Sequence, residues 1–107
     1  MTPDEALLVL CTAPDGEVAE KLARGLVEQK LAACVNVIPG LRSFYVWKGE
    51  LCDDAEVQLL IKTRRAHFDE LAAWLGEHHP YEVPEILALP IATGSEPYLA
   101  WMSKQTE

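Results

Sequence analysis

Apolar and polar residues alternate along an unusually long stretch in the middle of the chain. The alternation runs through residues 31–37 and resumes at residues 44–47, on either side of Pro39-Gly40. A period of two is typical of a strand. Because proline lacks an N–H and glycine relaxes φ, the dipeptide predicts a bend or bulge inside one strand that runs from residue 31 to residue 48.

The pattern predicts that this strand turns back on itself. Lys48-Gly49 is typical of a two-residue hairpin turn, in which glycine supplies a positive φ. Residues 50–63 then predict a returning strand, because Val57, Leu59 and Ile61 alternate with polar residues. Asp53-Asp54 lies near the tip and is expected to face solvent or a neighbouring subunit.

The length of this hairpin predicts that its tip projects from the domain. At roughly 3.3 Å per residue, residues 31–48 would extend about 60 Å. A compact chain of about 100 residues has a sphere-equivalent diameter of roughly 34 Å. Since residues 44–47 read Phe-Tyr-Val-Trp, a projecting tip needs something to cover its apolar side chains. Another copy of the same chain is the expected cover, so the pattern predicts an obligate oligomer.

Two segments have the periodicity of amphipathic helices. After Asp15, which can cap a helix, an apolar stripe is formed by Val18, Leu22, Gly25 and Leu26. Residues 65–77 repeat the pattern with Phe68, Leu71, Ala72 and Leu75.

The remaining segments predict two more strands and a terminal helix. Residues 6–12 form a continuous apolar run, as in a buried strand. Residues 78–84 contain two prolines and are not helical, and residues 85–91 predict the last strand, with Pro90 at an edge or a bulge. Ser95 is the expected cap of a short helix that presents Tyr98, Trp101 and Met102 on one face.

This order of elements predicts an α+β fold. Two βα units joined by a hairpin pack as a four-stranded antiparallel sheet with helices on one face, which is the ferredoxin-like βαββαβ plan. Here the hairpin of the second and third strands is elongated and a C-terminal helix is added. At 107 residues the chain is expected to form a single domain, residues 1–107.

Composition narrows the classes of partner. A net charge of −8 argues against nucleic acid, because a phosphate backbone is bound mainly through Lys and Arg. Three unclustered cysteines favour neither a disulfide framework nor a zinc site. The N-terminus does not resemble a signal peptide and no segment approaches a membrane span. We therefore expect a cytoplasmic protein with reduced thiols.

Several motifs resemble the CutA divalent-cation tolerance family. They are VLCTAPD at residues 9–15, KLAACVNVIPG at residues 30–40, YVWKG at residues 45–49, HHPYEVPEI at residues 78–86 and YLAW at residues 98–101. The resemblance covers nearly the whole chain in order and spacing. It implies a homotrimer of ferredoxin-like subunits and a role in tolerance to copper and other divalent metal ions.

The resemblance also implies candidate copper ligands. The family's cysteine and its two histidines correspond to Cys11, His78 and His79. Thiolate and imidazole are suitable ligands for copper and other late transition metals. Two other interpretations stay open, since a buried cysteine can serve only as a small apolar residue and exposed histidines bind copper adventitiously.

A second candidate site is a pocket between subunits. The loop around PYEVPE offers Tyr81, Glu82 and Glu85, which could line such a pocket together with Lys62 and Trp47 of the hairpin. Alternatively, the same residues only hold a stiff loop against a neighbouring chain.

Three classes of function follow. The first is a non-enzymatic trimer that binds divalent metal ions, with copper as the possible cofactor. The second is a trimer similar to PII-type signalling proteins, with a cleft for a small anion or metabolite and basic groups supplied by Lys62, Arg64 and Arg65. The third, an enzyme using Cys11 or the pair Arg42 and Asn36, lacks the motifs of phosphate loops and nucleophile elbows.

Overall fold

The computed structural model describes residues 2–107 and forms one four-stranded sheet with three helices. The strand order is β2-β3-β1-β4, and each described pair is antiparallel, so the predicted ferredoxin-like plan is confirmed. The elements are β1 (Ala6–Ala13), α1 (Gly16–Glu28), β2 (Cys34–Trp47), β3 (Glu50–Arg64), a 3₁₀ turn (Arg65–His67), α2 (Phe68–His78), β4 (Leu87–Pro90) and α3 (Glu96–Gln105).

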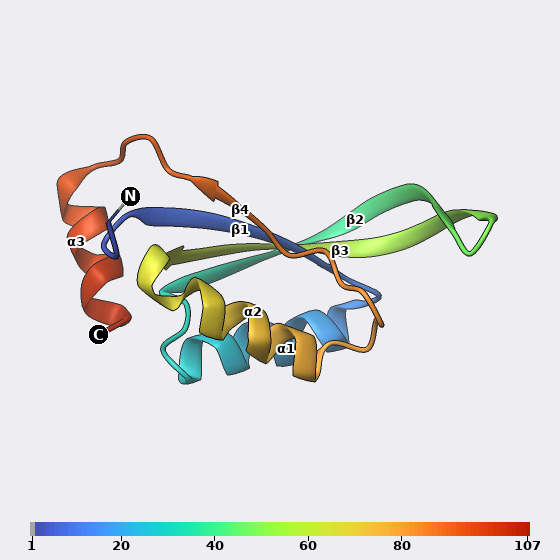
Figure 1. Ribbon diagram of the computed structural model, residues 1–107, viewed down its shortest axis with the longest axis horizontal. Helices are drawn as coiled ribbons and strands as arrows, with labels where there is room; N and C mark the ends of the chain where they lie inside the picture. The colour runs from blue at the N-terminus through green and yellow to red at the C-terminus, as the bar shows by residue number, and fades with distance from the viewer. Residues whose placement is uncertain (1) are drawn as a thin grey trace.

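Helices α1 and α2 cover one face of the sheet (Figure 1). The carboxylate of Asp15 accepts a hydrogen bond from the Val18 N–H at 2.8 Å, so this residue caps α1 as predicted. Alternate residues of β1 and β3 point toward the helices and are buried. The core between sheet and helices contains Val9, Cys11, Leu22, Leu26, Leu59, Ile61, Leu71 and Leu75.

The hairpin of β2 and β3 contains both predicted irregularities. The pairing register shifts between Ile38 and Leu41, and Gly40 there has a φ of +87°. This is the bulge that Pro39-Gly40 predicts. At the tip, Lys48 and Gly49 have φ values of +50° and +81°, as a type I′ turn requires.

The hairpin extends past the helices. The molecule measures 44 × 25 × 24 Å along its principal axes, and Figure 1 shows the hairpin tip at one end of the long axis, with both termini at the other. Three apolar side chains near the tip, Phe44, Val46 and Leu51, are 63%, 67% and 76% exposed. The predicted projection is therefore confirmed.

Two predicted strand boundaries were too generous. Strand β2 begins at Cys34 rather than at residue 31, because the N–H groups of Leu31 and Ala32 bond to the Leu26 carbonyl and complete the end of α1. Strand β4 spans only Leu87–Pro90 instead of residues 85–91, and its pairing with β1 ends at Pro90. As predicted, this proline lies on an edge strand.

Helix α3 packs beside the ends of β1 and β3. Ser95 caps it by accepting a hydrogen bond from the Tyr98 N–H at 3.4 Å. Of the three residues predicted on one face of α3, Met102 is buried, whereas Tyr98 and Trp101 are exposed. Their rings pack against each other with centroids 5.5 Å apart.

No helix covers the second face of the sheet (Figure 1). The register places Leu8, Leu10 and Leu60 on this face, and their side chains are only partly buried. Leu87 and Leu89 of β4 pair with the first two and are exposed. In the described part of the chain, no helix is long and apolar enough to cross a membrane.

Candidate functional site

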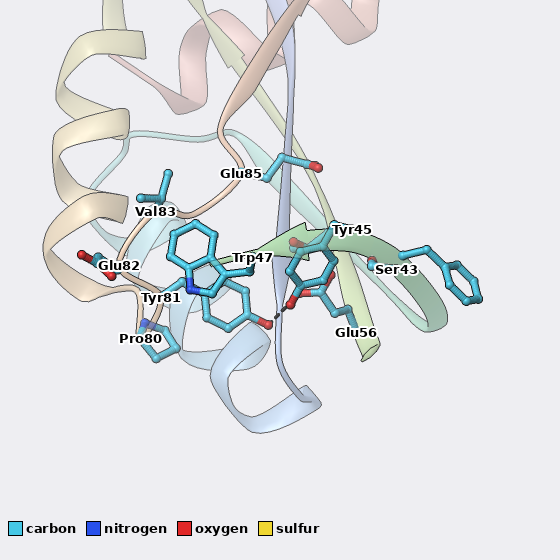
Figure 2. A pocket seen from close by; sticks show the side chains of 11 residues that line it. Ser43, Tyr45, Trp47, Glu56, Pro80, Tyr81, Glu82, Val83 and Glu85 are labelled. Atoms are coloured by element: carbon cyan, nitrogen blue, oxygen red, sulfur yellow. Dashed lines mark hydrogen bonds between the residues drawn. The ribbon is translucent and has the colours of Figure 1, made fainter. Parts of the chain in front are cut away.

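An open cleft of about 640 Å³ lies between the hairpin and the segment that follows α2. Residues of both hairpin strands form one side of the cleft, and the segment from Pro80 to Glu85 forms the opposite side (Figure 2). The two prolines of that segment, Pro80 and Pro84, keep it out of helical geometry. The cleft is lined by Thr12, Ser43, Phe44, Tyr45, Trp47, Glu56, Pro80, Tyr81, Glu82, Val83 and Glu85.

Glu56 is the most buried charged group of the cleft. Its side chain belongs to β3, and the residue is only 6% exposed. The hydroxyl of Tyr81 donates a hydrogen bond of 2.6 Å to its Oε2, drawn as a dashed line in Figure 2. Burial and this hydrogen bond to a carboxylate raise the pKa of Tyr81 above its usual range. Tyr81 therefore remains a hydrogen-bond donor to Glu56.

A second tyrosine–carboxylate pair lies on the hairpin. The hydroxyl of Tyr45 donates a short hydrogen bond to Asp54 on the neighbouring strand. This bond is the main reason that the pKa of Tyr45 is raised. Tyr45 lines the cleft, whereas Asp54 is not among its lining residues.

The structure brings together four of the five predicted pocket residues. Trp47, Tyr81, Glu82 and Glu85 all line the cleft. Lys62 does not, because its ammonium group donates a 2.6 Å hydrogen bond to Asn36 elsewhere on the sheet. The predicted pocket lies between subunits, so the place of Lys62 in it stays a prediction.

Glu56 and Tyr45 were not predicted as site residues. Both lie within the alternating strands, where their polar groups fit an ordinary solvent-facing position. Their contacts join residues that are 25 and 9 positions apart. The acidic character of residues 50–56 was the one sequence signal that pointed to them.

Cys11 lies inside the apolar core. Its side chain is fully buried, and its thiol donates a weak hydrogen bond of 3.7 Å to the Thr12 carbonyl. Burial raises the pKa of the thiol to about 12, and the negative charges of Glu85 and Glu56 add to this effect. Since the thiolate is the form that binds metals, this environment disfavours coordination by Cys11.

Both ring nitrogens of His79 are already used. The N–H of Tyr81 donates to Nδ1 at 3.1 Å, so Nδ1 carries the lone pair. The proton is then on Nε2, which donates to the Thr12 carbonyl at 2.7 Å. The buried His79 links the end of β1 to the loop after α2 and has no free lone pair for a metal ion.

His78 differs from its neighbour. Its exposed ring stacks on Trp74, with centroids 4.1 Å apart, and Nδ1 donates to the Trp74 carbonyl at 2.8 Å. Because Nδ1 carries the proton, Nε2 of the neutral ring keeps its lone pair. Residues 2–107 contain no group of three His, Cys, Asp or Glu side chains arranged to hold a metal ion. Within one chain, the three predicted ligands therefore do not form a metal centre.

The chain is similar to known proteins over most of its length. The family model of the CutA1 divalent ion tolerance protein matches residues 7–105. The divalent-cation tolerance protein CutA of Thermus thermophilus is 50% identical over 99 residues, which cover 92% of this chain and 96% of that protein. The CutA protein of Pectobacterium atrosepticum is 46% identical, with 92% and 90% covered.

Solved structures agree with these sequence relationships. The Thermus thermophilus divalent cation tolerance protein superposes with a TM-score of 0.92 at 49% identity, covering 95% of this chain and 99% of that one. CutA from Xylella fastidiosa superposes with a TM-score of 0.94 at 38% identity, covering 96% and 99%. For CutA1 from Oryza sativa the TM-score is 0.93, the identity 42% and the coverage 96% and 94%.

Proposed function

We propose, on the premise that the chain belongs to the CutA1 divalent ion tolerance family, that it works as a non-enzymatic homotrimer. In this proposal it binds copper or another divalent metal ion and so contributes to metal tolerance. The three free cysteines suit a reducing compartment, so we place the trimer in the cytoplasm.

One observation supports the proposed assembly into a homotrimer. The hairpin of β2 and β3 projects past the helices with exposed apolar side chains on both of its faces: Phe44, Val46 and Leu51 on one, Tyr45 and Trp47 on the other. A protruding apolar ribbon is costly in water and its open edge invites pairing. A second and third copy of the chain would cover it.

The uncovered face of the sheet supports the same proposal. Leu87 and Leu89 are exposed there beside the half-buried Leu8, Leu10 and Leu60. An apolar sheet face without a covering layer is typical of a subunit rather than of an isolated domain.

The metal proposal rests on the family and on the imidazole of His78. Of the three predicted ligands, only His78 combines exposure with an available lone pair, on Nε2. A single imidazole is a weak site, so the remaining ligands would come from other copies or from solvent. Cys11 and His79 would contribute only after their buried surroundings open.

A competition titration tests whether the protein binds copper through His78. Cu²⁺ would be titrated against a chelator of known affinity into the wild type and into His78→Ala, His79→Ala and Cys11→Ala variants. We expect stoichiometric binding that His78→Ala weakens by about tenfold or more, the loss of one imidazole ligand. Cys11→Ala should leave it almost unchanged, because the thiol is buried and protonated.

Equal binding in all four proteins would show that copper binds nonspecifically, and the metal site would then be removed from the proposal. The oligomeric state of each variant would be measured in the same samples, so a loss of assembly is not mistaken for a loss of ligand.

A second candidate function is favoured by the cleft between the hairpin and the loop after α2. Its size is that of a small-molecule site, which fits an effector-binding trimer similar to PII-type proteins. The lining does not favour the anionic effector expected from the sequence, because Lys62 lies outside and Glu56, Glu82 and Glu85 lie inside.

A further inference from the structure

A second cavity, of about 440 Å³, is bordered by the N-terminal segment before β1, the segment after β4 and α3. Figure 1 shows α3 and both termini at the end of the molecule opposite to the hairpin tip. The hairpin and sheet-face side chains that the proposed trimer covers all lie outside the lining of this cavity. The cavity therefore does not depend on the surfaces that the assembly buries.

Glu5 brings an uncompensated carboxylate to this cavity. The residue is half-buried, and its Oε1 is closed off from water and accepts no hydrogen bond within residues 2–107. The carboxylate also takes part in none of the ion pairs of this part of the chain. A buried acceptor without a donor costs free energy, and a charge in such a place costs more. Since Glu5 lines the cavity, a cation bound there would lower this cost.

Arg64 also lines the cavity, but its guanidinium is already engaged. It donates hydrogen bonds to the Thr106 hydroxyl at 2.8 Å, to the Thr106 carbonyl at 2.9 Å and to Asp4 at 3.0 Å. Its Nη2 lies 3.2 Å from Nε2 of His67. Because Asp4 offsets the charge of Arg64, the charge of Glu5 remains unmatched within the lining.

Around Glu5 the lining combines hydroxyl groups with aliphatic side chains. The residues concerned are Thr2, Thr93 and Ser103 for the first kind and Ile91, Leu99 and Met102 for the second. A primary ammonium group has three N–H donors, which carboxylate and hydroxyl oxygens can accept. A quaternary ammonium group has no such donor and is held mainly by aromatic rings. The lining therefore suits a primary ammonium group on an aliphatic chain.

We propose that this cavity binds an aliphatic primary amine in its protonated form. The ammonium group would pair with Glu5 and donate to the neighbouring hydroxyl groups, and the alkyl chain would lie against Leu99 and Met102. The volume of the cavity lies within the range of small-molecule sites. Amines of this kind stay protonated at neutral pH, as the side chain of lysine does. The inference does not depend on copper binding at His78.

The lining favours an ammonium group over a divalent metal ion. Calcium and magnesium take six or more oxygen ligands, mainly carboxylates, carbonyls and waters. Here Asp4 already pairs with Arg64, and residues 2–107 contain no group of three His, Cys, Asp or Glu side chains that could hold a metal ion. The guanidinium of Arg64 would also repel a doubly charged ion.

Calorimetric titration of the native assembly with three probes of the same carbon chain tests the proposal. The probes are 3-methylbutylammonium, 3-methyl-1-butanol and trimethyl(3-methylbutyl)ammonium. We expect the primary ammonium to bind at least roughly tenfold more tightly than the alcohol, because the alcohol forms no charge pair with Glu5. It should also bind several-fold more tightly than the quaternary ammonium, which cannot donate hydrogen bonds.

Variants then locate the site. Glu5→Gln keeps the side-chain size and removes the charge, so we expect a folded protein in which the preference for the primary ammonium over the alcohol is lost. Ser103→Ala removes one hydroxyl acceptor and should weaken the primary ammonium while leaving the quaternary one unchanged. The matched control is Glu96→Gln, which removes an exposed carboxylate of α3 outside the lining and should leave all three affinities unchanged.

Three results would overturn the proposal. They are equal binding of the primary ammonium and the alcohol, no binding of the primary ammonium at millimolar concentration, and an affinity that Glu5→Gln leaves unchanged. A cavity filled by a neighbouring copy in the assembly would give the second of these results. Stoichiometric displacement of the probe by micromolar Mg²⁺ or Mn²⁺ would also overturn the proposal, by identifying a metal site. Measuring the mass of the assembly in the same samples separates each of these results from a failure of the trimer.

Discussion

Folding changes the acid–base chemistry of Cys11. In the unfolded chain its thiol titrates at the ordinary value of 9.0, whereas burial in the core raises its pKa to about 12. Between these values the unfolded chain loses the proton first. A group whose pKa is raised by folding supports the folded state fully below its unfolded pKa and loses that contribution as the pH rises toward the folded value.

This difference predicts an alkaline loss of stability that depends on Cys11. The free energy of unfolding should fall from about pH 9 upward, by roughly 2.5–3 kcal/mol at pH 11 from this group alone. Cys11→Ala lacks the titrating thiol, so its deficit relative to the wild type, about 1–2 kcal/mol at pH 7 from the lost core volume, should shrink or reverse above pH 10. Denaturant unfolding of both proteins from pH 7 to pH 11 measures this. Parallel pH profiles would contradict the burial of the thiol.

At the scale of elements, the contact between the two sheet-covering helices depends on one glycine. A Cβ atom at Gly25 of α1 would lie 2.4 Å from two ring atoms of Trp74 on α2. The absence of a side chain therefore lets the outer edge of the indole ring approach α1 closely. The ring of Trp74 in turn stacks on His78, so the same contact supports the end of α2.

Gly25→Ala is expected to destabilise the protein even though alanine favours helices. The gain in helix propensity is about 1 kcal/mol, and displacing a packed indole costs about 1–3 kcal/mol, so the net effect is a loss. The matched control is Gly76→Ala in α2, where nothing lies within 4 Å of the added Cβ. That variant should be stabilised by up to about 1 kcal/mol. Chemical denaturation midpoints of the two variants compare the effects, and stabilisation by both would refute the close packing of Trp74.

The whole molecule is asymmetric, with its hairpin at one end and its helices on one face of the sheet (Figure 1). In the isolated chain the apolar groups of the hairpin and of the uncovered sheet face meet water. These two surfaces lie on separate parts of the molecule, so a closed ring of copies can cover both, whereas one small partner would cover only one.

Val46→Asp on the hairpin tests the assembly. If other copies cover the tip, the new carboxylate is buried in an interface and the oligomer dissociates. Light scattering after size-exclusion chromatography should then show the wild type at three times the chain mass of 11.9 kDa and the variant at a lower mass. Val27→Asp adds the same charge at an exposed position on α1 and should leave the mass unchanged. A wild-type monomer, or a trimer that tolerates Val46→Asp, would contradict the proposed cover.

The local pattern was sufficient for the elements and much of the fold. Asp15 and Ser95 cap their helices, Pro39-Gly40 makes a bulge and Lys48-Gly49 makes the turn. These features depend on backbone preferences and on neighbours within a few positions, so the sequence alone determines them. The boundaries at residues 31 and 85 were less certain, because hydrogen bonds with other elements decided them.

The candidate site was decided by the tertiary structure. Which side chains of β3 meet the loop after α2 depends on strand register and twist, so Glu56 meets Tyr81 in the cleft while Lys62 of the same strand lies outside. The same packing buries Cys11 in the core. It also engages both ring nitrogens of His79 in hydrogen bonds, one of them to Thr12, which lies 67 positions away in the sequence. The sequence motifs show only that such residues are present in the chain. Only the folded backbone decides which of their lone pairs and charges remain available to a ligand.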